Sequence, residues 1–191
     1  MAFFICEDLI LPDSLSEELV SSQRVYEGRV VSLRVDTVRL PSDRITEREI
    51  VEHQGSVAIV ALDEDDDVIL VNQFRAAVGR ALLEIPAGTL EAGEDAEACA
   101  FRELQEETGY VAGHLEELYT FYTSPGFSNE RIWLYLGTNL KPGSQDMESD
   151  ENIEVIKLPL DKALEMISSA EICDGKTILG LMAAYARRLT S

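Results

Sequence analysis

The chain has 191 residues and an apolar fraction of 46%, so we expect one domain with room for a small second unit rather than a disordered chain. Its 36 acidic residues against 16 Lys and Arg give a formal charge of −20, which disfavours non-specific binding to nucleic acid or anionic lipid. Three scattered cysteines without a CxxC pair argue against disulfides or zinc and indicate the cytoplasm. No apolar run approaches the roughly 18 residues of a membrane span.

The beginning of the chain is rich in strand signals. Residues 25–39 alternate apolar and polar side chains, residues 41–44 (PSDR) are typical of a turn, and residues 48–53 (REIVEH) predict another strand. We therefore expect residues 1–52 to form a separate small sheet ahead of a main domain over residues 53–191.

Two β-branched apolar runs open the predicted main domain. Residues 56–62 (SVAIVAL) and 68–74 (VILVNQF) are typical of buried strands. The DEDDD segment between them has the aspartates of a calcium loop, but Val68 stands where such a loop needs glycine and Phe74 where it needs glutamate. A solvated hairpin turn is the prediction for residues 63–67.

Residues 95–108 change to a helical period. Small and apolar side chains recur every four residues from Ala96 to Thr108, and Gly109 is placed to end the helix. Helices interspersed among strands predict a layered α/β fold with a mixed sheet. Further strands are expected over residues 82–88, 114–124, 131–136 and 153–158, and further helices over residues 160–170 and 175–189.

Three glutamates lie within five residues of this helix. Glu103, Glu106 and Glu107 occupy positions i, i+3 and i+4, which share one helical face. Carboxylates at such distances repel each other unless a cation lies between them, and oxygen ligands favour hard Mg²⁺ or Mn²⁺. Taken alone, the three residues favour the simpler interpretation of a solvated acidic face.

The glutamates belong to a longer pattern, GTLEAGEDAEACAFRELQEETGY over residues 88–110. It resembles the Nudix box at every defined position, with Tyr110 at a last position that is usually aliphatic. The resemblance implies an α/β/α sandwich with a mixed central sheet, a small N-terminal antiparallel sheet, and Mg²⁺-dependent cleavage of a nucleoside diphosphate. By the same resemblance Glu94 and Arg102 fix the loop and helix. We place Arg102 with the catalytic groups because it can hold a box carboxylate.

The metal ligands are implied residue by residue. In Nudix enzymes the positions of Glu103 and Glu107 are the main ligands, and that of Glu106 is a further ligand or organises the metal-bound water. The carbonyl of Ala87, just before the box glycine, is a frequent extra ligand. The cofactor implied is Mg²⁺, with Mn²⁺ as a substitute.

Residues outside the box resemble one branch of the family. Pro125 in SPGFSNE follows Tyr110 by fifteen residues, as in ADP-ribose pyrophosphatases, and the strings before the box look like that branch too. The motif of NADH-cleaving relatives, SQPWPFPxS, is absent. The resemblance implies hydrolysis of ADP-ribose to AMP and ribose 5-phosphate. Hydrolysis of GDP-mannose or ADP-glucose and a non-enzymatic ligand sensor remain the alternatives.

The catalytic carboxylate of the family comes from a loop before the last strand, here residues 143–155. Glu151 stands where the branch usually has an acidic catalytic or metal-binding residue. Some members carry a second glutamate two residues earlier, where this chain has Ser149 with Glu148 beside it. The resemblance therefore leaves the base open between Glu151 and Glu148.

Substrate-binding residues are expected on both parts of the chain. Arg75 resembles a family arginine that meets the phosphates, Arg48 is a candidate for the terminal ribose or phosphate, and Tyr26 offers a flat ring to adenine. Relatives are homodimers that exchange the N-terminal sheet, so residues 1–52 are a predicted dimerisation region that serves the neighbouring site. Pro125, Gly126 and Glu130 complete the candidate substrate residues.

Overall fold

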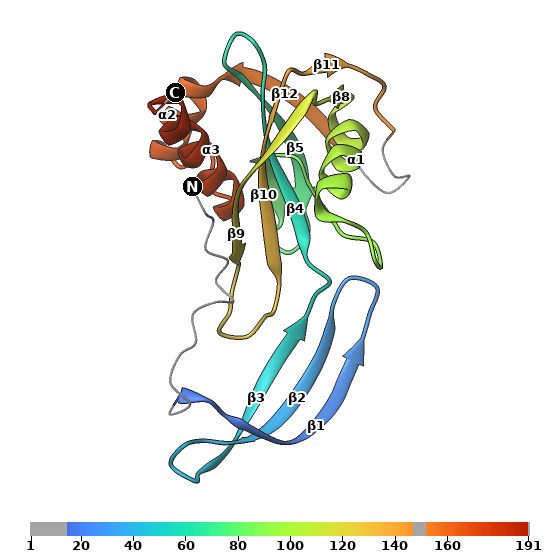
Figure 1. Ribbon diagram of the computed structural model, residues 1–191, viewed down its shortest axis with the longest axis vertical. Helices are drawn as coiled ribbons and strands as arrows, with labels where there is room; N and C mark the ends of the chain where they lie inside the picture. The colour runs from blue at the N-terminus through green and yellow to red at the C-terminus, as the bar shows by residue number, and fades with distance from the viewer. Residues whose placement is uncertain (1–14, 147–151, 191) are drawn as a thin grey trace. The chain divides into compact units, whose positions relative to one another are not determined.

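The computed structural model describes residues 15–146 and 152–190, which fold as two compact units. The small unit comprises the described residues up to 55 together with 120–131, and the large unit comprises the remainder. Figure 1 labels the elements. In chain order these are β1 (Glu18–Glu27), β2 (Ser32–Arg39), β3 (Ile45–Glu52), β4 (Ser56–Leu62), β5 (Asp67–Arg75), β6 (Arg80–Glu84), β7 (Ala87–Thr89), α1 (Ala96–Thr108), β8 (Tyr110–Val111), β9 (His114–Tyr122), β10 (Arg131–Thr138), β11 (Lys141–Pro142), β12 (Ile153–Pro159), α2 (Leu160–Ser168) and α3 (Gly175–Arg188).

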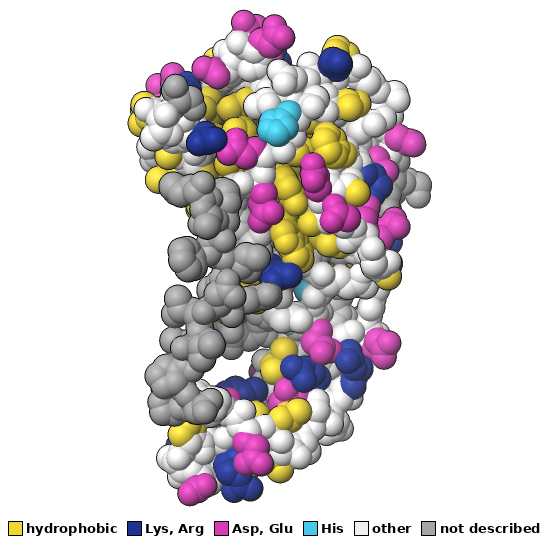
Figure 2. Space-filling model, viewed as in Figure 1, with side chains coloured by type: hydrophobic (Ala, Val, Ile, Leu, Met, Phe, Trp, Pro, Cys, Tyr) yellow, Lys and Arg dark blue, Asp and Glu magenta, His cyan; other side chains and the backbone are white. Residues whose placement is uncertain are grey.

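The small unit is built on an antiparallel sheet in the order β1-β2-β3, which confirms the predicted N-terminal antiparallel sheet. The strand-like stretch over residues 25–39 is two strands, because the chain turns after Gly28, whose N–H donates to the Val31 carbonyl at 3.0 Å. Every residue of β1 is exposed. Acidic and basic side chains intermix over this sheet (Figure 2), and pairs such as Arg24–Glu52 at 2.8 Å connect its strands.

The large unit is an α/β/α sandwich around a mixed sheet, as predicted. Its main strand order is β12-β5-β4-β10-β9, with β6 beside β5 and β7 beside β4. Strands β4 and β10 run parallel, whereas the β4–β5 and β5–β12 pairs are antiparallel. Helix α1 covers one face of this sheet, and α2 and α3 cover the other (Figure 1). Among the described residues, no helix has both the length and the apolar character needed to cross a membrane.

The core forms on both faces of the buried strand β4. Ile59 lies in the apolar cluster that includes Leu104 of α1. The next residue, Val60, faces the opposite side of the sheet and packs against Gly180 of α3. The packing is so close that a Cβ added to Gly180 would lie 2.8 Å from Cγ2 of Val60. This alternation follows from the two-residue period of a strand, which turns successive side chains to opposite faces. Strand β4 therefore joins the two helical layers.

The acidic segment between β4 and β5 is the predicted hairpin turn. The Asp63 N–H donates to the Asp67 carbonyl at 3.1 Å, and the Asp63 carboxylate accepts the N–H groups of Asp65 at 2.9 Å and Asp67 at 3.0 Å. Lys157 of β12 pairs with the Asp63 carboxylate. These bonds account for the aspartates as turn formers.

Candidate active site

The box folds as a short strand, a loop and helix α1. Asp95 caps the helix, because its carboxylate accepts the N–H groups of Glu97 at 3.0 Å and Ala98 at 3.2 Å. Gly109 ends the helix with a positive φ of 73° and an N–H that donates to Gln105 at 2.8 Å. The predicted helix and its stop are thus confirmed. Both ends of the segment that carries the glutamates are held by local hydrogen bonds.

Two of the box glutamates turn toward the strand that precedes the helix. Glu107 is only 3% exposed, and its Oε2 accepts the Ala87 N–H at 3.0 Å. The Glu103 carboxylate lies so close to Gly88 that a Cβ added there would stand 1.9 Å from its Cδ atom. Only glycine at position 88 therefore leaves room for this carboxylate. The structure brings Glu103 and Glu107 together at residues 87–88, with Glu106 more exposed beside them.

Arg102 lies among the carboxylates of the box. Its Nη1 contacts Glu103 at 2.8 Å and Glu106 at 2.9 Å, while its Nε and Nη2 grip the two oxygens of Glu94 at 2.9 Å each. The bond from Arg102 lowers the pKa of Glu94 to about 2, with burial opposing and the Glu91 backbone assisting. The pKa of Arg102 is raised, chiefly by Glu94. Arg102 therefore ties the loop to the helix and offsets part of the negative charge.

The donor set suits a hard divalent cation. Three carboxylates and the Ala87 carbonyl offer only oxygen, which is the ligand type of Mg²⁺. The cradle at Gly88, where Glu103 meets the backbone closely, is a second feature that fits a cation held between strand and helix. As the described side chains lie, they form no ready group of three or more metal ligands. Glu103 and Glu106 are held by Arg102 instead, so binding a cation requires these two carboxylates to exchange partners.

A second charged network lies in the large unit and was not predicted. Arg75, a predicted phosphate ligand, pairs through Nε and Nη2 with both oxygens of Glu84 at 2.9 Å each. Glu84 is 1% exposed and also accepts from Lys176, which in turn pairs with Asp174 at 3.0 Å. The pKa of Arg75 is raised first by Glu84 and further by the charges of Glu107 and Asp174. The one sequence signal for this network is a glutamate inside the apolar run LLEIP.

The remaining substrate candidates belong to the small unit. Arg48 pairs with Glu17 at 2.6 Å, and the Tyr26 side chain is 58% exposed. Glu130 accepts the Thr123 hydroxyl at 2.6 Å. Pro125 and Gly126 lie in the turn that the Ser124 carbonyl closes by accepting the N–H groups of Phe127 at 3.1 Å and Ser128 at 2.9 Å.

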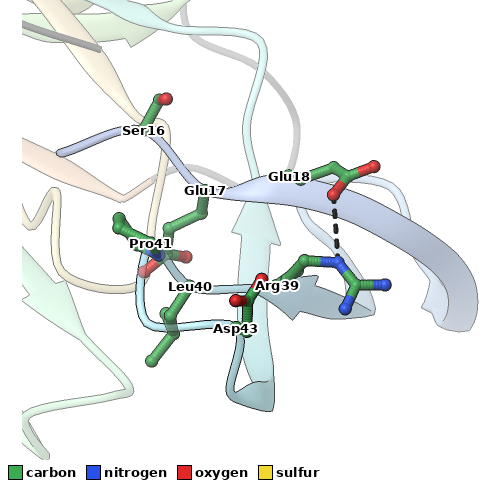
Figure 3. A pocket seen from close by; sticks show the side chains of 7 residues that line it. All are labelled: Ser16, Glu17, Glu18, Arg39, Leu40, Pro41 and Asp43. Carbon is green, nitrogen blue, oxygen red and sulfur yellow. Dashed lines mark hydrogen bonds and ion pairs between the residues drawn. The ribbon is translucent and has the colours of Figure 1, made fainter. Parts of the chain in front are cut away.

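A hollow of about 320 Å³ lies at one end of the small sheet (Figure 3). Glu17, Glu18 and Asp43 line it together with Arg39, which pairs with Glu18 at 3.1 Å. The hollow has three carboxylates but only one arginine, and that arginine already pairs with Glu18. Its negative charge therefore disfavours binding of an anionic diphosphate. It contains none of the predicted site residues.

Glu148, Ser149 and Glu151 lie outside the described residues, so the predicted catalytic base has no structural account. The described chain just before them is fastened to the end of α1. The Gln145 side-chain amide donates to the Glu107 carbonyl at 2.6 Å, and the Asp146 N–H donates to the Glu106 carbonyl at 3.2 Å.

The sandwich and the box geometry define a Nudix-type fold with a separate small N-terminal sheet. A family model described as NUDIX domain matches residues 52–177, and one described as nucleoside diphosphate sugar hydrolase N-terminal domain matches residues 17–51. The chain belongs to the NUDIX family.

Relatives with curated names include two kinds of pyrophosphatase. An ADP-ribose pyrophosphatase of Bacillus subtilis (strain 168) is 41% identical, covering 86% of this chain and 90% of that one. A GDP-mannose pyrophosphatase of Citrobacter koseri is 36% identical, covering 69% of this chain and 74% of that one. A crystal structure of an ADP compounds hydrolase aligns with a TM-score of 0.81 at 19% identity, covering 92% of this chain and 96% of that one. At this identity the structural match shows the shared fold alone.

Proposed function

We propose that the protein hydrolyses the diphosphate bond of nucleoside diphosphate sugars, with ADP-ribose as the preferred substrate and AMP and ribose 5-phosphate as products. The observation that carries the proposal is the meeting of Glu103 and Glu107 with the backbone of residues 87–88 inside an intact box. The ADP-ribose pyrophosphatase that is 41% identical over most of the chain supports the choice of substrate.

In the proposed mechanism, the box residues bind a metal ion that offsets the charge of the diphosphate. Glu103, Glu106, Glu107 and the Ala87 carbonyl would hold Mg²⁺, with Mn²⁺ as a substitute. When bound, the ion neutralises phosphate charge and lowers the pKa of an attacking water. Before the ion binds, Arg102 holds Glu103 and Glu106, and its pair with Glu94 ties the loop to the helix. A protein with a net charge of −20 needs such local cations to hold an anionic substrate.

The proton acceptor we favour is Glu151, with Glu148 as the alternative. Both stand in the segment before β12, where the family resemblance places an acidic residue. Arg75 is the proposed phosphate ligand from the large unit, because it resembles a family arginine that meets the phosphates and its pair with Glu84 uses only Nε and Nη2.

We further infer a homodimer that exchanges the small unit. Residues 1–52 form the proposed dimerisation region and residues 53–191 the hydrolase domain. In this arrangement Tyr26 and Arg48 serve the neighbouring subunit's site, and Pro125, Gly126 and Glu130 line it. The exposed strand β1 supports the proposal, because it lies at the edge of its sheet and can present backbone N–H and C=O groups to a second copy. A cytoplasmic location is proposed from the free thiols of Cys99 and Cys173.

A second candidate function is hydrolysis of another sugar nucleotide, such as GDP-mannose or ADP-glucose. It is favoured by the GDP-mannose pyrophosphatase among the relatives. The box does not discriminate between these substrates, because its carboxylates address only the diphosphate. A ligand sensor without catalysis is the remaining alternative.

A substrate panel with Mg²⁺ tests these alternatives. Alkaline phosphatase releases phosphate from the monophosphate products but not from an intact diphosphate diester, so phosphate release reports cleavage. We expect the highest kcat/KM with ADP-ribose. A higher value with GDP-mannose would make GDP-mannose the preferred substrate instead. Absence of turnover on every diphosphate would support the sensor.

The variant Glu107→Gln tests the role of the box. We expect kcat to fall by about a hundredfold or more, the usual cost of removing a key electrostatic group. Glu97→Gln is the matched control, because Glu97 lies in the exposed first turn of the same helix. Near-normal turnover of Glu107→Gln would refute the assignment.

A further inference from the structure

We infer that Lys176, at the start of α3, is a positioning residue that acts through Glu84 to hold the Arg75 guanidinium ready for the substrate diphosphate. The inference rests on the proposed function, in which Arg75 binds phosphate. It adds a residue that lies 92 positions from Glu84 in the sequence and outside the box.

Glu84 sets the orientation of the Arg75 guanidinium. This carboxylate is 1% exposed, and Arg75 takes both of its oxygens, Nε to Oε1 and Nη2 to Oε2, at 2.9 Å each. Such a two-point pair fixes the plane of the guanidinium. Among the described residues, none accepts a hydrogen bond from Nη1, so this nitrogen remains for a ligand. The orientation of Arg75 therefore depends on where Glu84 is held.

Lys176 and the start of α3 hold Glu84 in place. Lys176 contacts the same Oε2 atom that Arg75 uses, and its side chain is only 15% exposed. Asp174 holds the Lys176 ammonium at 3.0 Å and caps α3 by accepting the Thr177 N–H at 3.0 Å. The Thr177 hydroxyl donates to Asp174 at 2.6 Å and accepts the Ile85 N–H at 2.9 Å. The start of α3 is thus fastened to the backbone just after Glu84.

The charges of this network balance. Arg75 and Lys176 supply two positive charges, and Glu84 and Asp174 supply two negative ones. Burial alone would raise the pKa of Asp174, but Lys176 and Thr177 outweigh it, so that the pKa lies below its ordinary value. Without Lys176, the carboxylates of Glu84 and Asp174 would compete for Arg75, on which the charge of Glu107 also acts. The guanidinium would then be drawn away from the ligand, and the site would gain a net negative charge that repels a diphosphate.

The kinetic test compares Lys176→Met with Lys162→Met. Lys162 is a surface residue of α2 whose side chain is 58% exposed and pairs with Glu165, so its loss controls for removing one positive charge. We expect Lys176→Met to raise KM for ADP-ribose by roughly tenfold, the effect of one lost charge-assisted contact, with a smaller change in kcat. Lys176→Arg should restore most of the affinity, and Lys162→Met should resemble the wild type. An unchanged KM in Lys176→Met would overturn the inference.

A double-mutant cycle separates positioning from direct contact or general destabilisation. In an Arg75→Met background, Lys176→Met should raise KM little further, because the residue it acts through is gone. The same fold increase in both backgrounds would overturn the inference. If Lys176→Met does not fold, Lys176→Gln is used in the same cycle.

An NMR measurement on the Arg75 side chain tests the role of Lys176 without any substrate turnover. The Arg75 Nε–H resonance, assigned by its loss in Arg75→Lys, should exchange slowly with water in the wild type because Nε is bound to buried Glu84. It should shift and exchange faster in Lys176→Met and recover in Lys176→Arg. An unchanged resonance in Lys176→Met would refute the positioning role. Failure of the wild type to cleave any nucleoside diphosphate sugar would refute the proposed function alone.

Discussion

Gly88 is a position where the Glu103 carboxylate leaves no room for a side chain. A Cβ at this position would stand 1.9 Å from Cδ and 2.1 Å from Oε1 of Glu103, so Gly88→Ala must displace that carboxylate. Because the obstacle is the end of a flexible side chain, the fold should survive with an unfolding temperature within a few degrees of the wild type. We expect Mg²⁺-dependent kcat/KM to fall by roughly tenfold to a hundredfold, as for a misplaced catalytic group.

Gly175→Ala is the control for this change, because an added Cβ there meets no atom within 4 Å. Its activity should equal that of the wild type. Normal activity in Gly88→Ala would show that the position of Glu103 is unimportant.

Glu94 links the box to the pH dependence of stability. Arg102 lowers the pKa of Glu94 to about 2 in the folded protein, below its ordinary value of 4.5. A lowered folded pKa stabilises the protein above the unfolded pKa, and this stabilisation is lost as the pH falls through the folded pKa. We therefore expect Glu94→Gln to lower the free energy of unfolding at pH 7, and its difference from the wild type to shrink between about pH 4.5 and pH 2. Urea denaturation at several pH values measures this difference, and a gap independent of pH would contradict it.

The site residues differ in how far the sequence could predict them. Arg102 and Glu106 lie four residues apart on one helix, so helical geometry alone brings them together. The pairing of Glu84 with Lys176 spans 92 residues and depends on how α3 meets β6, which no local pattern encodes. The sequence therefore predicts the acidic face of α1 but not the charge network of Glu84 and Lys176.

Among the elements, those with strong local signals were predicted well. Helix α1 begins at an Asp cap and ends at a left-handed glycine, and β4 is a continuous β-branched run. The short strands β8 and β11 were not predicted, because two residues each carry no periodicity. The turn after Gly28 was also missed, since the alternation of side chains continues across it.

Helix α3 packs closely enough on the sheet to require glycine at one position. A Cβ at Gly180 would lie 2.8 Å from Val60 Cγ2 and 3.0 Å from Ile85 Cδ1, both in fully buried residues. Alanine gains about 1 kcal/mol in helix propensity, but overpacking a core costs about 1–3 kcal/mol. We expect Gly180→Ala to lower the free energy of unfolding by about 1 kcal/mol, measured by urea denaturation. Met182→Ala, at an exposed position of α3, should change it by less than about 0.5 kcal/mol; a stabilised Gly180→Ala would contradict the packing.

At the scale of the whole molecule, the small sheet leaves much apolar surface uncovered. Leu19, Val25 and Tyr26 of β1 are 55%, 56% and 58% exposed. A small sheet gains stability when its apolar side chains are covered and removed from water. The large unit, by contrast, buries both faces of β4 within itself. A second copy of the chain is the partner that the proposed exchange would supply.

The proposed exchange of the small unit predicts that the protein is a dimer in solution and that Val25→Asp weakens this dimer. The wild type should have twice the chain mass by light scattering, and a charge at Val25 should favour monomers because it would be buried between copies. Met182→Asp is the matched control, since Met182 is 57% exposed but lies on α3 of the large unit. A wild type that is monomeric at all concentrations, or a Val25→Asp variant that remains dimeric, would contradict the arrangement.

Exchange also predicts complementation between two inactive variants. If Arg48 serves the neighbouring site, a mixed dimer of Arg48→Ala and Glu107→Gln subunits contains one site with an intact box and an intact Arg48. Unfolding and refolding the two variants together should therefore restore part of the wild-type activity, whereas each variant refolded alone stays weak. If Arg48 served the site of its own chain, every site in the mixture would carry one defect and no activity would return. The mixing experiment thus tests whether the small unit works for its own subunit or for its partner.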